Sequence, residues 1–150
     1  MKSKAIKKIG ERTFVLVMDS GDEVVATLTD FAKAQGFAAS HFTGIGALHD
    51  VTLGFFDWKT KDYTRIVLDE QVEVLSLMGD IALDENEPRV HAHIVVGRSD
   101  GSAHGGHLLE AHVRPTLEIM LIETPALLRR TYDPESGLAL INLRKSGVTP

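Results

Sequence analysis

Apolar and polar residues alternate with a period of two along most of the chain, the pattern of strands that bury one face. This alternation, interrupted by turn residues, predicts short strands over residues 13–18, 37–48, 49–56, 63–68, 71–77, 81–83, 107–113, 116–123 and 138–143, with one more that begins at residue 89. Residues 84–88, DENEP, are expected to form a solvated acidic loop, and residues 1–11 and 144–150 to be tails. Residues 127–132 are predicted to be irregular or helical.

One segment repeats its apolar residues at the helical period instead, and it is the one strong helix that the sequence predicts. Its apolar stripe consists of Val24, Val25, Leu28, Phe31 and Ala32. Asp19 or Ser20 is expected to cap its start, because Ser20 and Glu23 have the spacing of a capping box, and Gly36 is expected to end it. The stripe is expected to face the core.

Many strands and a single early helix place the chain in the α+β class, with a mostly antiparallel sheet. Segment 116–123 is apolar on both faces, with Leu117, Ile119 and Leu121 on one side and Met120 and Ile122 on the other. Both faces of such a sheet need cover, and one helix can cover only one of them. Packing between subunits is the natural way to cover the second face.

The chemistry on which the functional interpretation rests lies in residues 89–107, RVHAHIVVGRSDGSAHGGH. Strand alternation puts His91 and His93 on one face, with Cα atoms roughly 6.5–7 Å apart. One zinc ion can bridge that gap through two imidazole nitrogens at about 2.0–2.1 Å. A turn-rich loop at residues 99–102 and the glycine pair Gly105-Gly106 let the chain turn back, so that His107 comes alongside at the start of the next strand. These three histidines are the candidate ligands of a zinc site with an open fourth position, as catalytic zinc sites have.

A second interpretation is a half-buried histidine cluster, hydrogen-bonded internally, to a carboxylate or to a neighbouring subunit. The nearby carboxylates are Asp100, Glu110 and Glu118, which would orient an imidazole or act as acid or base, although each also suits a turn or surface role. His104 lies among glycines and is the weakest local ligand. The remaining histidines stand alone without metal-ligand spacing: His41, His49 and His112.

Charge and cysteine content exclude several classes of function. Lys and Arg number 16 against 21 Asp and Glu, and the formal net charge of −5 opposes non-specific attraction to DNA or anionic membranes. The absence of cysteine excludes disulfides, thiolate metal sites and cysteine nucleophiles. No segment approaches the roughly 20 apolar residues of a membrane span, and no signal-peptide core follows the basic N-terminus, so we expect a cytoplasmic protein.

The histidine segment also resembles a family signature, through His91-x-His93, Gly97, Asp100-Gly101 and Gly105-Gly106-His107-Leu108. This signature is that of the PPC domain, "plants and prokaryotes conserved", which is also classed as a domain of unknown function and as a predicted DNA-binding protein with a PD1-like motif. Residues 44–47 and 72–79 resemble its early glycine turn and its middle strand, although Gln71-Val72 stands where plant members usually have Arg-Phe. The resemblance covers about residues 10–145.

The resemblance implies a single PPC-type domain over residues 1–150, with an ordered core of about 10–145, that assembles as a homotrimer and is a candidate DNA-binding or regulatory protein. The chain is acidic and lacks the Arg-Gly-Arg-Pro AT-hook core of plant relatives. We therefore expect a trimer that binds a small ligand or a partner rather than a direct reader of DNA. A fold-level resemblance to acetolactate decarboxylase, which holds zinc by three histidines, supports an alternative, a zinc-dependent enzyme acting on a small oxo- or hydroxy-acid.

Overall fold

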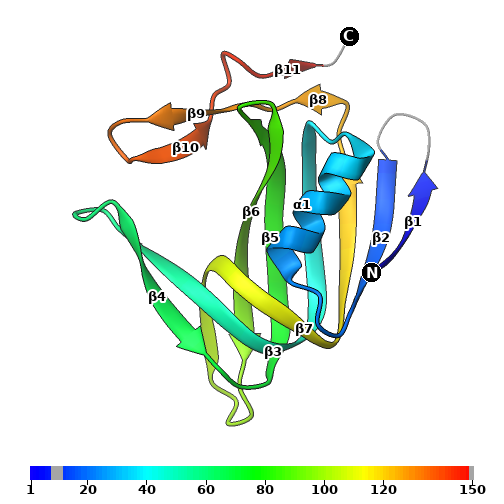
Figure 1. Ribbon diagram of the computed structural model, residues 1–150, viewed down its shortest axis with the longest axis vertical. Helices are drawn as coiled ribbons and strands as arrows, with labels where there is room; N and C mark the ends of the chain where they lie inside the picture. Colours follow the sequence, from blue (N-terminus) through cyan, green and yellow to red (C-terminus); the bar gives the residue numbers. More distant parts are fainter. Residues whose placement is uncertain (8–11, 149–150) are drawn as a thin grey trace.

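The computed structural model describes residues 1–7 and 12–148 (Figure 1). Within these residues it contains one α-helix and a mostly antiparallel sheet, which confirms the predicted α+β class. The sheet is strongly curved, and the helix lies across one of its faces (Figure 1). No helix in the described part of the chain is long and apolar enough to cross a membrane.

The seven strands of the main sheet pair in antiparallel fashion, in an order that differs from their order in the sequence. From one edge to the other they are β1 (Lys2–Lys7), β2 (Arg12–Asp19), β7 (Ala103–Glu123), β6 (Glu87–Gly97), β5 (Val72–Asp84), β3 (Ala39–Asp57) and β4 (Asp62–Leu68). Strand β7 also pairs with β3, so β7, β6, β5 and β3 form a closed ring of pairings. Two smaller sheets follow, formed by β9 (Arg130–Asp133) with β10 (Leu138–Ile141) and by β8 (Ala126–Leu127) with β11 (Gly147–Val148).

Helix α1 (Val24–Gln35) begins later than the sequence predicts. Its N-cap is Glu23, whose carboxylate accepts hydrogen bonds from two backbone N–H groups of the first turn. The predicted cap at Asp19 or Ser20 is wrong, because these residues enter a turn and the Ser20 hydroxyl donates to the carbonyl of Pro115 instead. Gly36 ends the helix as predicted, with a φ of 67° that glycine adopts without strain.

The core lies between α1 and the sheet. The helix contributes Val24, Leu28, Phe31 and Ala32, all buried, as its apolar stripe predicts. Phe14 of β2 and Phe37 pack against Phe31, with ring centroids 5.4 to 5.7 Å apart among the three rings. Aromatic packing of this kind adds to the large apolar area that these residues bury.

The opposite face of the sheet is apolar in part and carries no helix (Figure 1). Its apolar side chains are 40% to 61% exposed, and with the strand residues between them they define what we call the open face: Ile45, Leu75, Met78, Val95 and Met120. A shallow depression of about 390 Å³ on this face is lined by several of them. Exposed apolar patches of this kind mark interaction surfaces.

Several predicted strands merge into longer ones. Residues 39–48 and 49–56 of the predicted strands lie in β3, and residues 72–77 and 81–83 lie in β5. The predicted solvated loop at residues 84–88 is shorter than expected, because β5 and β6 turn directly about the exposed Glu85 and Asn86, which have φ of 49° and 74°. Positive φ at both positions gives the tight hairpin turn whose twist matches that of the strands.

Strand β7 joins the two predicted strands 107–113 and 116–123 and begins earlier, at Ala103. It passes through Arg114–Pro115, which is a cis peptide bond. Leu109 is the extra residue of a bulge, since the residues on either side of it pair with consecutive residues of β3. The bulge explains why simple alternation fails beyond His107.

The chain ends are more ordered than the predicted tails. Residues 2–7 form the edge strand β1, and residues 147–148 pair with β8. The helical alternative for residues 127–132 is wrong, because Leu127 ends β8 and residues 130–132 lie in β9. Residues 8–11 and 149–150 of the predicted tails lie outside the described residues.

Candidate metal site

Strand β6 presents His91 and His93 on the open face, as alternation predicts. The residues that follow each of them, Ala92 and Ile94, are buried on the core side of the sheet. In the pairing with β5, His93 lies opposite Met78. The histidines are therefore continuous with the apolar side chains of the open face.

His107 comes from β7 and lies directly opposite His93 in the β6–β7 pairing. The predicted loop at residues 99–102 is confirmed, but its extension to Gly105 and Gly106 is wrong, because both glycines lie within β7. A Cβ at Gly105 would lie 3.2 Å from the carbonyl oxygen of Ile94, and one at Gly106 would lie 2.9 Å from that of Gly54. The missing side chains let the strands approach closely beside His107.

The three imidazoles form what we call the histidine triangle. Ring centroids are 5.3 Å apart for His91–His93 and for His93–His107, and 5.2 Å apart for His91–His107. One ligand nitrogen from each ring lies within 4.8 Å of the other two. Among the described residues, no other set of three or more His, Asp or Glu side chains has this geometry.

Burial controls the protonation of this triangle. Burial lowers the pKa of His107 to about 4, with further lowering by the charges of His91, His93 and Arg89. Burial and the neighbouring His91 also lower the pKa of His93. Both rings are therefore neutral near pH 7, which is the form that binds a metal ion. His107 Nδ1 is buried and has no hydrogen-bond partner among the described residues.

Asp80 is the carboxylate behind His91, and sequence reasoning missed it. Its Oδ2 lies 3.5 Å from His91 Nδ1, and its Oδ1 accepts a hydrogen bond from Arg130. Burial raises the pKa of Asp80, but His91 and Arg130 outweigh that effect and hold the pKa below its ordinary value. An ionised carboxylate beside Nδ1 favours the tautomer of His91 that carries its proton there, which would leave Nε2 free to bind a metal ion. Its position opposite His91 in the β5–β6 pairing is the signal that identifies it.

Tyr63 covers the triangle on its other side and was also missed. Its ring stacks on His107 with centroids 4.7 Å apart. Gly54 makes room for this contact, since a Cβ there would lie 2.7 Å from the Tyr63 ring. Burial raises the pKa of Tyr63, so its hydroxyl stays protonated at neutral pH. The contact joins β4 to β7, two strands that do not pair, so no pattern along the chain indicates it.

The three carboxylates that the sequence places near the histidines have other surroundings. Asp100 accepts hydrogen bonds from the backbone N–H and the hydroxyl of Ser102, in the β6–β7 turn. Glu110 Oε2 lies 3.5 Å from Arg65 Nη2. Glu118 is exposed beside the depression on the open face. None of these contacts involves the triangle.

Two of the other histidines also stay apart from the triangle. His104 lies opposite Val96, whose side chain is buried, so it lies on the face of the sheet away from His107. His41 is exposed and lies opposite Asp80 in the β3–β5 pairing. The sequence correctly separates both from the candidate ligands.

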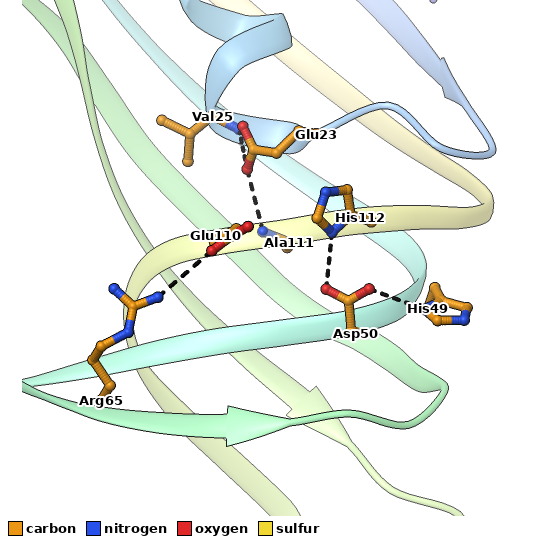
Figure 2. A network of polar contacts seen from close by, with 8 residues as sticks. All are labelled: Glu23, Val25, His49, Asp50, Arg65, Glu110, Ala111 and His112. Atoms are coloured by element: carbon orange, nitrogen blue, oxygen red, sulfur yellow. Dashed lines mark hydrogen bonds and ion pairs between the residues drawn. The ribbon is translucent and has the colours of Figure 1, made fainter.

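His49 and His112 do not stand alone, contrary to the sequence prediction, because both bind Asp50 (Figure 2). Each Nδ1 lies 2.9 Å from a different oxygen of this carboxylate. Burial raises the pKa of Asp50, but the hydrogen bonds from the two imidazoles hold it below its ordinary value. The hydrogen bond to Asp50 raises the pKa of His112. Nearby, Glu23 also accepts from the Ala111 backbone N–H, which ties the start of α1 to β7 (Figure 2).

A small cavity of about 160 Å³ adjoins the triangle. Its lining comes from β4, β6, β7 and the β9–β10 hairpin: Tyr63, Arg89, Val90, His91, His107, Arg130, Leu138, Ala139 and Leu140. Two histidines of the triangle, His91 and His107, therefore line this cavity.

The donor set fits a divalent ion of the zinc type. Three imidazoles converge, two of them with lowered pKa, and a carboxylate lies behind one of them. The buried Nδ1 of His107 needs a partner that the described protein residues do not supply. Calcium and magnesium prefer oxygen ligands, so an all-imidazole group suits them poorly.

Fold and site together define a class of protein: a small α+β domain whose curved sheet carries a three-histidine group on its open face. The Plants and Prokaryotes Conserved (PCC) domain matches residues 7–125, and the chain belongs to this family. The match confirms the resemblance that the histidine segment indicates.

Solved structures place the chain among similar proteins. A candidate DNA-binding protein from Bacteroides thetaiotaomicron is 33% identical, with a TM-score of 0.86 over 95% of this chain and 99% of that one. A metal-containing protein from Archaeoglobus fulgidus is 30% identical, with a TM-score of 0.82 over 94% of this chain and 96% of that one. A Staphylococcus aureus protein similar to alpha-acetolactate decarboxylase is 11% identical, with a TM-score of 0.54 over 79% of this chain and 52% of that one, and shares the fold alone.

The chain also resembles part of a larger curated protein. It is 30% identical over 137 residues to the bifunctional protein GlmU of Synechococcus sp. (strain JA-3-3Ab), covering 89% of this chain and 21% of that protein. The chain thus spans about a fifth of the length of the curated relatives it matches.

Proposed function

We propose that residues 1–150 form a single homotrimeric domain that holds a zinc ion through His91, His93 and His107 and binds a small ligand beside it. The observation that carries the proposal is the convergence of three ligand nitrogens within 4.8 Å of one another. Zinc is the ion most often bound by three histidines with a further position left for water or ligand. The relative from Archaeoglobus fulgidus is named as metal-containing, which supports this choice.

The bound ion would supply a Lewis acid next to the cavity. The protein residues around it have separate tasks. Asp80 orients His91, because its carboxylate faces Nδ1 and leaves Nε2 for the ion. Tyr63 holds the ring of His107 in place by stacking on it. Burial of His107 keeps its imidazole neutral and available.

A homotrimer is supported by the open face. Its apolar side chains are up to 61% exposed, and no helix of the described chain covers them. The face is continuous with the triangle through the pairing of Met78 with His93, so a subunit packed on it would border the site. Sedimentation of the full chain at micromolar concentration is expected to give a trimer, and a clean monomer would contradict this part of the proposal.

A zinc-dependent enzyme acting on a small oxo- or hydroxy-acid is the second candidate. It is favoured by the cavity of about 160 Å³, because a small molecule bound there would contact two of the three histidines. Three protein ligands also leave a coordination position for a reacting group. Metal binding is a requirement of both candidates.

Metal analysis of untagged full-length protein is the experiment that tests the proposal. After zinc loading and gel filtration, we expect about one zinc per chain, since the three ligands come from one subunit. A content below roughly a tenth of an equivalent would contradict both the binding protein and the enzyme.

Direct reading of DNA by the folded domain is not part of the proposal, although relatives are named as candidate DNA-binding proteins. The net charge of −5 opposes it. We propose instead that any weak DNA binding comes from the N-terminal lysines. Because residues 2–7 form β1, lysine-to-glutamine substitution is a better test than deletion. A low-salt mobility shift should disappear when Lys2, Lys4, Lys7 and Lys8 are replaced, and its persistence would reveal a basic face on the domain.

A further inference from the structure

The cavity beside the histidine triangle indicates the chemical class of the ligand. We infer that it binds a small carboxylate, an organic acid of a few carbon atoms held by Arg89 and Arg130. The inference rests on the proposed function, because it assumes that the triangle forms one wall of a ligand site. The second observation behind it is the charge and hydrogen bonding of the lining itself.

Arg89 brings a guanidinium with spare donors to the cavity. Its Nη1 donates to Asp84 at 2.9 Å, and among the described residues its other N–H groups have no hydrogen-bond partner. Its charge contributes to the lowered pKa of His107, so its field reaches the triangle. A guanidinium with two free N–H groups matches the two oxygens of a carboxylate.

Arg130 supplies a second cation to the cavity lining, from β9. Its side chain is 7% exposed, with Nη2 bonded to Asp80 and Nη1 bonded to the carbonyl of Ala139 at 3.3 Å. Its Nε is buried and has no partner among the described residues. A buried unpaired donor on a charged group is costly, and an acceptor oxygen placed nearby would remove that cost.

The balance of charge favours an anion. Among the described residues, no carboxylate lines the cavity, and Asp84 and Asp80 each contact one of its two arginines. A divalent ion held by the triangle would add two positive charges. The positive charge of the two arginines and the ion would then exceed the negative charge of the two aspartates.

The rest of the lining selects a short carbon chain over an inorganic ion. Val90 and the β10 segment from Leu138 to Leu140 form an apolar wall. Tyr63 adds a hydroxyl that has no hydrogen-bond partner among the described residues and suits a hydroxyl or carbonyl oxygen of the ligand. A volume of about 160 Å³ lies below the range of drug-sized pockets, so only a few carbon atoms fit.

Calorimetric titration of the zinc-loaded full chain with matched probes tests the inference. Lactate and pyruvate represent short acids, lactamide is the neutral counterpart of lactate, and inorganic phosphate is an anion without a carbon chain. We expect at least one acid to bind at least about tenfold more tightly than lactamide and more tightly than phosphate. Equal binding of acid and amide, or tighter binding of phosphate, would overturn the inference.

Substitutions of single arginines test where the acid binds. Arg89→Gln should weaken the binding of the acid about tenfold or more, while Arg129→Gln, with the same change in net charge, should leave it unchanged. Arg129 is a suitable control because it bonds to Asn86 and lines only the neighbouring groove. Arg130→Lys keeps the charge beside Asp80 but removes Nε, and should also weaken binding. Equal losses in the Arg89 and Arg129 variants would overturn the assignment.

The experiment distinguishes failure of the proposed metal site from failure of the carboxylate site. Zinc content is measured before any acid is added, so a chain without zinc contradicts the metal site alone. The acid and amide titrations are then repeated on the zinc-free chain, where the N–H groups of the two arginines remain and a weaker preference for the acid is expected. A chain that holds zinc but does not distinguish lactate from lactamide keeps the proposed function and loses the carboxylate site.

Discussion

His93 lies directly opposite His107 across the β6–β7 pairing, and their ring centroids are 5.3 Å apart on one face of the sheet. Residues directly opposite one another in antiparallel strands hold their side chains closest. The backbone therefore sets the distance between these two ligands, and His91 joins them from two positions away on β6. A site built on paired strands is well placed to hold its geometry before a metal binds.

Replacing His93 by alanine should remove most of the stabilisation that zinc gives. Wild-type protein should gain about 2.7 kcal/mol at a hundredfold excess of zinc over its dissociation constant. Two remaining imidazoles hold zinc poorly against water, so the zinc-induced rise in Tm should largely vanish. His104→Ala is the matched control and should keep the full rise, since His104 lies on the other face. Equal rises in His93→Ala and wild type would identify the triangle as a packed histidine cluster.

Asp80→Asn should weaken zinc binding by about 10–100-fold, because the amide no longer holds His91 in its metal-binding tautomer through a charged contact. Competition with a chromophoric chelator measures this directly. Asp84→Asn changes another carboxylate of the same strand that contacts Arg89 and not a histidine. Unfolding of both metal-free variants separates a loss of affinity from a loss of fold. Unchanged affinity in Asp80→Asn would remove Asp80 from the site.

The positions of the first two ligands could be predicted from the sequence because they depend only on local geometry. Successive side chains of a strand point to opposite faces of the sheet in any surroundings, so His91 and His93 lie on the same face. The partner of His107 depends on register, which the turn at residues 98–102 sets, and the glycines within β7 suggested an incorrect turn. The roles of Asp80 and Tyr63 could not be predicted from the sequence, because their contacts depend on how separate strands pair and curve.

The N-cap of α1 shows the same limit of prediction from local sequence. Ser20 and Glu23 have the spacing of a capping box, and local pattern alone favours Ser20 as the cap. The structure uses Glu23 instead, which accepts from the first helical turn and also from the backbone of Ala111. The competing contact comes from β7, which no pattern near the helix can reveal. Tertiary contacts decided between two acceptable local solutions.

Gly79→Ala should destabilise the fold and disturb the site. A Cβ at this position would lie 2.3 Å from the carbonyl oxygen of His91 and 2.6 Å from the Phe42 ring, so β5 and β6 would have to move apart. Overpacking of this kind costs about 1–3 kcal/mol, and urea unfolding should show it. Gly147→Ala is the control, because a Cβ there meets nothing within 4 Å. Equal stability of the two variants would contradict the close strand approach beside His91.

Charges placed on the open face should dissociate the proposed trimer. Ile45→Glu and Met120→Glu would each require a carboxylate to be buried between subunits, whereas both side chains are partly exposed in the single chain. Sedimentation should show a shift toward monomer, with the circular dichroism spectrum retained. Leu143→Glu, at a side chain that is 80% exposed and lies outside the main sheet, is the control. Trimers that persist in both open-face variants would place the interface elsewhere.

The bridge of Asp50 between His49 and His112 should make stability depend on pH in a predictable direction. Folding raises the pKa of His112 above 6.5, so its contribution is complete below 6.5 and is lost as pH rises through the raised value. Folding lowers the pKa of Asp50 below 3.8, so its contribution is complete above 3.8 and is lost as pH falls through the lowered value. Between these limits the carboxylate is charged and His112 is protonated, and the bridge stabilises the fold most.

Asp50→Asn should therefore lower the free energy of unfolding most near about pH 5 and least near about pH 9. The His112 side chain is 39% exposed and that of Asp50 is 28% exposed, so solvent screening limits the difference to about 1 kcal/mol or less. Urea unfolding at the two pH values measures it. Asp62→Asn, a carboxylate with no imidazole partner among the described residues, should give the same result at both. A constant deficit for Asp50→Asn across this range would mean that the bridge acts as a neutral hydrogen bond, with no contribution from the charge of His112.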